Sequence, residues 1–143
     1  MDTTTDRTLL FVKHEHLPFA DEIFQYLREQ TNATIPTQRI TTMPREGWGK
    51  FYEHVEEGYP EIYETMISDF AGKPIAFTVP TGKNIATIVK RLAGPTKYED
   101  NPSWTIRGKW GPYETPHTIV HASDPDQVER DIRILIKYTG LEI

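Results

Sequence analysis

The sequence predicts an α+β sandwich in which a single sheet carries helices packed over one face. Three observations point to this fold class. Four short segments rich in apolar and β-branched residues have the length of strands, stretches with helical spacing of apolar residues lie between them, and the two kinds alternate as β-α-β-(αα)-β-α-β-α. A chain of 143 residues is long enough to bury a core, and we expect one domain over residues 1–143.

The first half of the chain contains two predicted strands with a helix between them. Thr8–Lys13, TLLFVK, is an apolar run of strand length, and Pro18 can open the helix that follows. The apolar residues of this helix recur at helical spacing: Ile23, Phe24 and Leu27. Thr34–Met43, TIPTQRITTM, is β-branched with partial alternation, which predicts the second strand.

The middle of the chain predicts two helices, a strand, another helix and a long connection. The helices are expected over Trp48–Glu57 and Pro60–Phe70, and the third strand over Ile75–Val79. Asn84–Leu92 places its apolar residues on one side of a helix. Ala93–Pro116 is rich in Gly, Pro and polar residues, and loops of this length are usually functional or disordered.

The stretch HTIVHASD, from His117 to Asp124, predicts the fourth strand and raises the first question about function. Because side chains alternate along a strand, His117, Ile119 and His121 are expected to share one face. His121 falls at the end of the strand, just before a helix start, where free N–H groups and the positive end of the helix dipole bind anions. A histidine in that place can act as a nucleophile or as an acid and base. The alternative is a half-exposed strand histidine without a chemical role.

The last helix is predicted from its start signals and its apolar face. Asp124 is expected to cap it, with Pro125 in the first turn and Gln127 completing a capping box. The predicted buried face consists of Val128, Ile132, Leu135 and Ile136.

Composition and charge disfavour several classes of function. The chain has no cysteine, which excludes disulfides, thiolate chemistry and Cys-ligated zinc, and a reducing cytoplasm is the expected compartment. The N-terminus lacks the pattern of a secretory signal, and no apolar run approaches the roughly 20 residues that span a bilayer. With a net charge of −5 and no basic patch, binding to nucleic acid is not expected, whereas small anionic ligands remain possible.

The long connection and the helix before it contain a group of residues suited to phosphate. Arginine donates hydrogen bonds in pairs, and glycine lets the backbone approach a ligand closely. The group surrounds Gly94 and Gly108 and consists of Lys90, Arg91, Thr96, Lys97, Arg107 and Lys109. A solvated charged loop is the alternative interpretation.

Four stretches taken together resemble the nucleoside diphosphate kinase family. They are FVK at Phe11–Lys13, FYEH with Tyr52, GKNIATIVKRLAGPT leading to TIRG, and HTIVHASD, and they follow the order and nearly the spacing of the family. The resemblance implies a ferredoxin-like βαββαβ sandwich, an antiparallel four-stranded sheet with helices packed over it. It also implies a ping-pong reaction, in which a nucleoside triphosphate gives its γ-phosphate to a histidine that passes it to a nucleoside diphosphate.

The same resemblance assigns roles to individual residues. By position the reactive histidine is His121, not His117. The other matches are the phosphate-contacting Thr96 and Arg107, Lys13 near the sugar 3′-hydroxyl and phosphates, Tyr52 close to the histidine, and Ser123 beside it. The family uses Mg²⁺ with ATP or another nucleoside triphosphate, and the resemblance implies a homo-oligomer.

Several positions depart from the family pattern. Thr118 stands where the family has an asparagine, and Lys90 where it has a second phosphate-binding arginine. Ala122 replaces a glycine and would crowd the approach to the histidine if its φ were positive. Asp131 takes the place of the glutamate that orients the histidine, after a one-residue gap, and Glu129 is the other carboxylate within reach. Ile62 and Tyr63 fall nearest to the base-stacking phenylalanines. A catalytically weak nucleotide-binding or regulatory module on the same fold is therefore a second hypothesis.

The histidines suggest a third hypothesis, a metal-dependent hydrolase or a structural metal protein. His14 and His16 share a face if the first strand extends that far, and His117 and His121 supply a second pair. Such pairs can ligate zinc, but no further ligand stands at a recognisable spacing.

Overall fold

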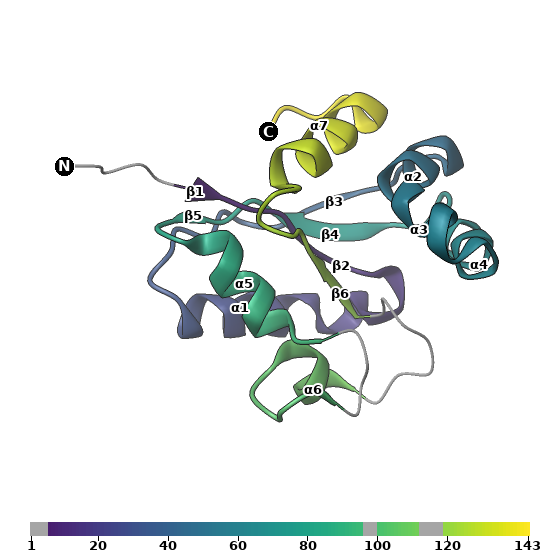
Figure 1. Ribbon diagram of the computed structural model, residues 1–143. Coiled ribbons are helices and arrows are strands. Elements are labelled where there is room, and N and C mark those ends of the chain that lie inside the picture. The colour runs from purple at the N-terminus through teal and green to yellow at the C-terminus, as the bar shows by residue number, and fades with distance from the viewer. Residues whose placement is uncertain (1–5, 96–99, 112–118) are drawn as a thin grey trace.

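The computed structural model describes residues 6–95, 100–111 and 119–143 (Figure 1). Its strands are β1 (Asp6–Arg7), β2 (Leu10–Val12), β3 (Arg39–Thr41), β4 (Ile75–Thr78), β5 (Thr81–Gly82) and β6 (Val120–Ala122). Its helices are the 3₁₀ helix η1 (His14–Phe19) and α1 (Ala20–Gln30), α2 (Arg45–Phe51), α3 (Glu53–Gly58), α4 (Pro60–Phe70), α5 (Ile85–Ala93), α6 (Ile106–Trp110) and α7 (Val128–Thr139). None of the helices in these ranges is both long and apolar enough to cross a membrane.

The main sheet has four antiparallel strands in the order β3-β4-β2-β6. The first and third of its strands along the chain, β2 and β4, occupy the centre, as in a ferredoxin-like sandwich, so the predicted fold is confirmed. Within the sheet, Phe11 of β2 lies opposite Phe77 of β4 on one side and His121 of β6 on the other. The register thus places the candidate nucleophile beside a central aromatic residue.

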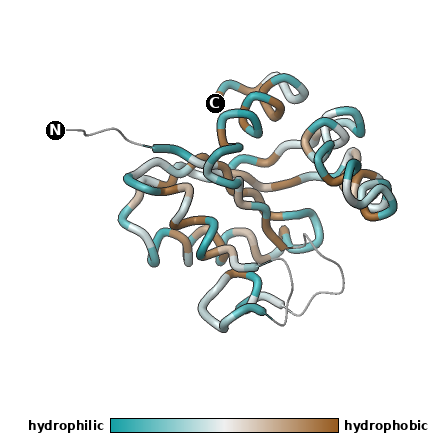
Figure 2. Tube along the Cα trace, viewed as in Figure 1, coloured by the Kyte–Doolittle hydropathy of each residue, from teal (hydrophilic) through white to brown (hydrophobic). Residues whose placement is uncertain are grey.

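Helices cover both faces of the sheet, so the prediction that they pack over one face is wrong. Phe11 belongs to the core that α2, α4 and α7 close, whereas Leu10 and Val12 belong to the core that α1 and α5 close (Figure 1). The uninterrupted apolar run of β2 is the physical reason, since a strand without polar alternation must be buried on both sides. Hydrophobic stretches run along these central strands in Figure 2.

The predicted fourth strand begins later than expected. Ile119 has a φ of 70°, a left-handed backbone that a β-branched residue rarely adopts, and it precedes β6. Its side chain is buried in the core formed with α1 and α5, together with Val120 and Ala122. The prediction that Ile119 shares a face with His121 is therefore wrong, because the left-handed residue breaks the strand alternation.

The predicted start of the last helix is also wrong. The helix α7 begins at Val128, and Asp124 instead opens a turn in which the Gln127 N–H donates to its carbonyl oxygen at 2.8 Å. The Asp124 carboxylate does not cap a helix, because it pairs with the ammonium of Lys90 at 2.9 Å. Ile136, expected on the buried face of the helix, is 36% exposed.

The predicted loop from Ala93 to Pro116 contains a short helix. Thr105 caps α6, and its hydroxyl accepts a hydrogen bond from the Gly108 N–H at 3.0 Å. This helix brings Arg107 into the interior, where the side chain is buried. The connection is therefore partly a structural element rather than an open loop.

Gly140 ends α7, and its contribution to the stability of that helix end can be tested. It has a φ of 74°, and its N–H donates to the Ile136 carbonyl at 2.9 Å. We expect Gly140→Ala to lower the free energy of unfolding by about 1 kcal/mol, because an added Cβ meets no atom within 4 Å but disfavours the left-handed backbone. Urea unfolding measures the change. Gly58→Ala in α3, with equally open space and no positive φ, is the control and should not destabilise the fold.

Candidate active site

The ring of His121 is held between aromatic side chains. It stacks on Phe11, with ring centroids 5.0 Å apart, and meets the edges of Phe51 at 5.0 Å and Tyr52 at 5.8 Å. Its side chain is 19% exposed. The packing fixes the plane of the imidazole while part of the ring remains accessible.

Each nitrogen of this imidazole has a distinct neighbour. Nε2 lies 3.4 Å from Oδ2 of Asp131, and Nδ1 lies 3.5 Å from the hydroxyl of Tyr52. Oδ2 of Asp131 also accepts a hydrogen bond from the hydroxyl of Ser123 at 2.6 Å. An ionised carboxylate only accepts hydrogen bonds, so its position favours the tautomer with the proton on Nε2 and a lone pair on Nδ1.

The surroundings shift the pKa values of His121, Asp131 and Tyr52. Burial lowers the pKa of His121, and the positive charges of Lys90 and Arg107 lower it further, against the opposing effect of Asp131. Burial raises the pKa of Asp131, but hydrogen bonds and charge from His121, Ser123 and Arg130 outweigh it and keep that pKa below its usual value. Burial raises the pKa of Tyr52, which stays a neutral phenol. At neutral pH the site therefore holds a neutral imidazole beside a carboxylate.

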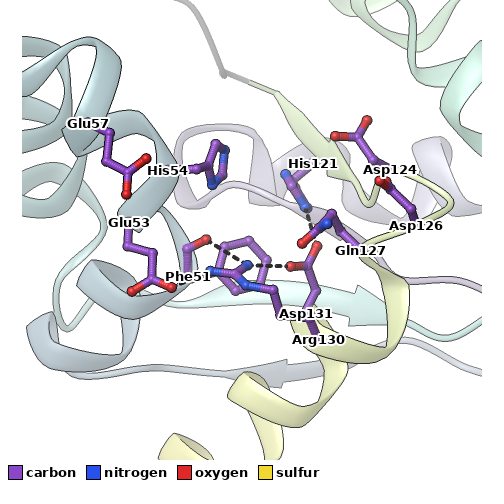
Figure 3. A pocket seen from close by; sticks show the side chains of 10 residues that line it. All are labelled: Phe51, Glu53, His54, Glu57, His121, Asp124, Asp126, Gln127, Arg130 and Asp131. Atoms are coloured by element: carbon purple, nitrogen blue, oxygen red, sulfur yellow. Dashed lines mark hydrogen bonds and ion pairs between the residues drawn. The ribbon is translucent and has the colours of Figure 1, made fainter.

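A cavity of about 400 Å³ opens beside His121 (Figure 3). Side chains of α3 line one side of it, and those of β6, of the turn before α7 and of α7 line the other. The lining consists of Phe51, Glu53, His54, Glu57, His121, Asp124, Asp126, Gln127, Arg130 and Asp131. A ligand of moderate size can reach the imidazole through this space.

Two predicted phosphate-binding cations lie near His121, and both already have partners. The Lys90 ammonium pairs with Asp124 and donates to the Ala122 carbonyl at 3.3 Å. The buried Arg107 guanidinium donates to the carbonyl oxygens of Gly94 and Val120, the latter at 2.7 Å. Both charges act on the imidazole, as its lowered pKa reflects.

Other predicted site residues lie apart from this cavity or outside the described residues. Lys13, at the end of β2, is buried and pairs with Asp69 of α4 and with Glu15 at 2.8 Å. Ile62 on α4 is 41% exposed and is not among the residues that line the cavity. Thr96 and Thr118 lie outside the described residues. The structure thus brings together Tyr52, Lys90, Arg107, His121, Ser123 and Asp131.

Ala122 does not crowd the site in the way that a positive φ would imply. Among the non-glycine residues that the structure describes, positive φ occurs at Asn84 and Ile119. Ala122 has ordinary strand backbone in β6, and its side chain is buried in the core on the face opposite His121. Its replacement of a glycine leaves the approach to the imidazole open.

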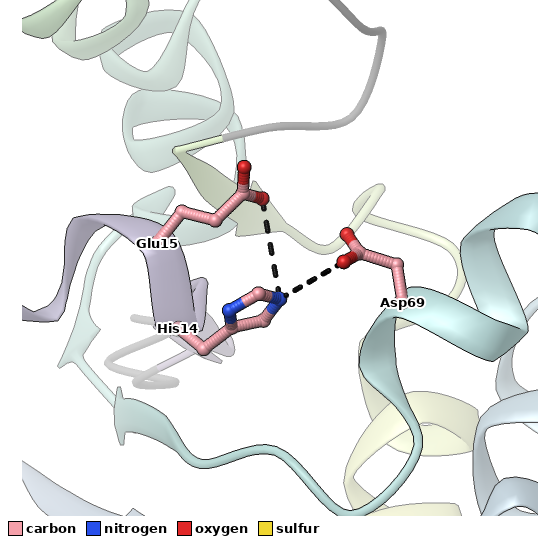
Figure 4. A group of neighbouring side chains, drawn as sticks. All are labelled: His14, Glu15 and Asp69. Carbon is pink, nitrogen blue, oxygen red and sulfur yellow. Dashed lines mark hydrogen bonds and ion pairs between the residues drawn. The ribbon is translucent and has the colours of Figure 1, made fainter.

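A second cluster, around His14, bears on the metal hypothesis (Figure 4). Its Nε2 lies 3.3 Å from Asp69 and 4.0 Å from Glu15, the one group with metal-ligand spacing within the described ranges. The ammonium groups of Lys13 and Lys73 already neutralise these carboxylates. His14 and His16 lie in η1 rather than on a strand face, because the chain leaves the sheet after Val12. The cluster is therefore a network of ion pairs, and His117 lies outside the described residues.

Among the side chains in contact with His121 or Asp131, sequence reasoning missed three. Phe11 and Phe51 flank the imidazole, and Arg130 binds the carboxylate of Asp131 at 3.0 Å. Phe11 is the first residue of FVK and Phe51 the first residue of FYEH, so both lie within stretches that already carried the resemblance. Arg130 carries no such signal, because its role depends on where α7 meets the end of α2.

Comparisons with known proteins agree with this geometry. The family model described as "Nucleoside diphosphate kinase" matches residues 6–140. The chain belongs to the nucleoside diphosphate kinase family. The predicted family and its enzyme class are therefore confirmed. Its relatives include a nucleoside diphosphate kinase of Staphylothermus marinus, 29% identical over 136 residues that cover 93% of this chain and 94% of the relative. Another, from Methanocaldococcus jannaschii, is 30% identical over 110 residues that cover 76% of each chain.

Solved structures of the family confirm the fold. The nucleoside diphosphate kinase of Aquifex aeolicus has a TM-score of 0.79 at 24% identity, covering 98% of this chain and 99% of that one. A halophilic nucleoside diphosphate kinase from Halobacterium salinarum, in complex with CDP, has a TM-score of 0.81 at 20% identity, covering 98% of this chain and 93% of that one.

The hydrogen bond from Ser123 to Asp131 can be tested by its contribution to stability. We expect Ser123→Ala to lower the free energy of unfolding by about 1–3 kcal/mol, because it removes a donor from a buried carboxylate. Urea unfolding at neutral pH gives the value. Ser68→Ala, which removes an exposed partner of Arg45, is the control and should change stability by less than about 0.5 kcal/mol. Equal effects of the two variants would contradict the assigned contact.

Proposed function

We propose that the nucleoside diphosphate kinase reaction of this family runs, in this chain, through Nδ1 of His121. The observation that carries the proposal is the pairing of Nε2 with the buried Asp131, which leaves the lone pair of Nδ1 beside the cavity. The lowered pKa of His121 supports the same assignment, since only the neutral imidazole is a nucleophile.

The proposed reaction has two mirrored steps. In the first, the Nδ1 lone pair forms an N–P bond to the γ-phosphorus while the bond to the β,γ-bridging oxygen breaks, and the nucleoside diphosphate leaves. In the second, the terminal phosphate oxygen of another nucleoside diphosphate attacks the phosphohistidine and the N–P bond breaks. Phosphoryl transfer needs positioning and charge stabilisation more than covalent chemistry from the protein. Asp131 stabilises the positive charge that develops on the ring.

Positive and hydroxyl groups near His121 would hold the transferred phosphate. Lys90 and Arg107 supply charge, and the neutral Tyr52 supplies a hydroxyl 3.5 Å from Nδ1. Ser123 would act through Asp131, to which it donates. The remaining nucleotide contacts are proposed on the family resemblance alone, and these are Lys13, Ile62, Thr96 and Thr118.

Magnesium would enter with the nucleotide as part of the substrate. Mg²⁺ prefers oxygen ligands and usually binds through one or two carboxylates together with substrate phosphates. Asp124 and Asp126 line the cavity and supply such oxygens. Magnesium would neutralise charge on the phosphates, and the chain's own residues would orient them.

A second candidate is a nucleotide-binding or regulatory module on the same fold. The observation that favours it is the engagement of two predicted phosphate ligands elsewhere, Lys13 with Asp69 and Glu15, and Arg107 with backbone carbonyls. A module of this kind would bind nucleotide without acquiring phosphate on His121. The two candidates therefore differ in one covalent product.

Labelling with γ-³²P-ATP and Mg²⁺ tests the proposed reaction. We expect acid-labile, alkali-stable phosphate on His121, and a fall in transfer of at least about 10³-fold in His121→Asn, which lacks the nucleophile. His16→Asn, in η1, is the matched control and should take up label as the wild-type protein does. A folded wild-type protein that binds nucleotide but stays unlabelled would favour the module instead.

We also propose a homo-oligomer, on the family resemblance, with residues 1–143 forming one catalytic domain. A cytoplasmic location is proposed because a cysteine-free chain suits a reducing compartment. Light scattering of the purified protein measures its mass in solution. We expect a multiple of 16.5 kDa, and a monomer over the working concentration range would contradict the proposed assembly.

A further inference from the structure

We infer that Arg130 is a positioning residue for phosphoryl transfer, one that fixes Asp131 and ties α7 to the end of α2. The inference rests on the function proposed above and adds a residue to it. Arg130 lines the same cavity as His121 but acts on the imidazole through Asp131 (Figure 3).

The guanidinium of Arg130 joins three helices. Nη1 donates to Oδ1 of Asp131 at 3.0 Å and to the Phe51 carbonyl at 3.2 Å. Nη2 donates to the Lys50 carbonyl at 2.7 Å and lies 3.5 Å from Oε1 of Glu53 in α3. The side chain is 24% exposed, so the rigid fork is partly shielded from water.

The contacts at the end of α2 have a physical reason. Lys50 and Phe51 are the last residues of this helix, where the carbonyl groups carry the negative end of the dipole and can accept further hydrogen bonds. A guanidinium satisfies two such carbonyls at once. Phe51 also packs edge-on against His121, with ring centroids 5.0 Å apart, so the same group anchors both sides of the imidazole.

The two carboxylate oxygens of Asp131 have different partners. Oδ2 faces His121 and Ser123, whereas Oδ1 receives the hydrogen bond from Arg130. Without Arg130, Oδ1 would lose its donor, and Ser123 alone would keep the carboxylate near Nε2, at an angle that is no longer fixed. An aspartate has a short side chain, so its reach to His121 depends on where α7 lies. Arg130 fixes that position.

Arg130 also offsets the charge of Asp131. The other charged or titratable groups acting on the imidazole are Lys90 of α5, Arg107 of α6 and Tyr52 after α2. Further titratable groups that line the same cavity are His54 and Glu57 of α3 and Asp124 and Asp126 before α7, and Glu53 faces Arg130 itself. Removal of the guanidinium leaves the carboxylate charge uncompensated, which stabilises the imidazolium. The pKa of His121 is therefore expected to rise when Arg130 is neutralised.

Two substitutions separate charge from geometry. Arg130→Met removes both the positive charge and the hydrogen bonds of the guanidinium. We expect the rate of phosphohistidine formation to fall at least about ten-fold and the pKa of His121 to rise. Arg130→Lys keeps the charge but loses the fork, so we expect a slower rate with a nearly unchanged pKa of His121. Arg133→Met removes an equal charge from the exposed face of α7, where Arg133 acts on Glu129, and should change neither.

The pKa of His121 is measured by NMR on the full-length, unphosphorylated protein, and the rate by rapid quench with γ-³²P-ATP. An Arg130→Met variant that folds and matches the wild-type protein in both readouts overturns the inference. If that variant does not fold, Arg130→Lys decides, and a wild-type rate there overturns it. The NMR measurement of the pKa does not depend on phosphoryl transfer. A wild-type protein that never forms phosphohistidine would therefore contradict the proposed function, whereas the effect of Arg130 on the pKa of His121 could still be measured.

Discussion

The site is organised around one buried carboxylate, that of Asp131. It accepts hydrogen bonds from Ser123 and Arg130, and it faces Nε2 of His121. A buried charge is tolerated only where donors and opposite charges compensate it. That requirement links β6, which carries the imidazole, to α7, which carries the carboxylate, and it determines which nitrogen of His121 is available for chemistry.

The sheet holds the imidazole of His121 from its other side, through strand β2. Antiparallel pairing places Phe11 of β2 directly opposite His121 of β6, and the rings stack. Because β2 is buried on both faces, its position is fixed by two cores at once. The imidazole on the neighbouring strand is therefore held by the most constrained part of the fold.

Much of the fold and part of the site were predictable from sequence. Apolar runs of strand length located β2 and β4, and the motifs around Tyr52 and His121 identified residues that the structure brings into contact. The number of covered sheet faces was predicted wrongly, because the expectation came from the order of elements rather than from the apolar run of β2. The start of α7 was misplaced because Asp124 resembles a helix cap locally, whereas its carboxylate pairs with Lys90 from a distant element. Arg130 could not be found, since it binds carbonyl groups that any sequence would present.

The ion pairs of Lys13 affect how strongly an anion would bind at this residue. In the described structure this buried ammonium lies between Asp69 and Glu15, so the charge of Lys13 is compensated. An incoming phosphate that takes Lys13 must replace one set of negative oxygens by another, and the released carboxylates must find water or other donors. If Lys13 binds phosphate as proposed, binding would exchange one counter-ion for another. Its strength would then depend on the difference between two similar attractions, not on the attraction of an unpaired charge.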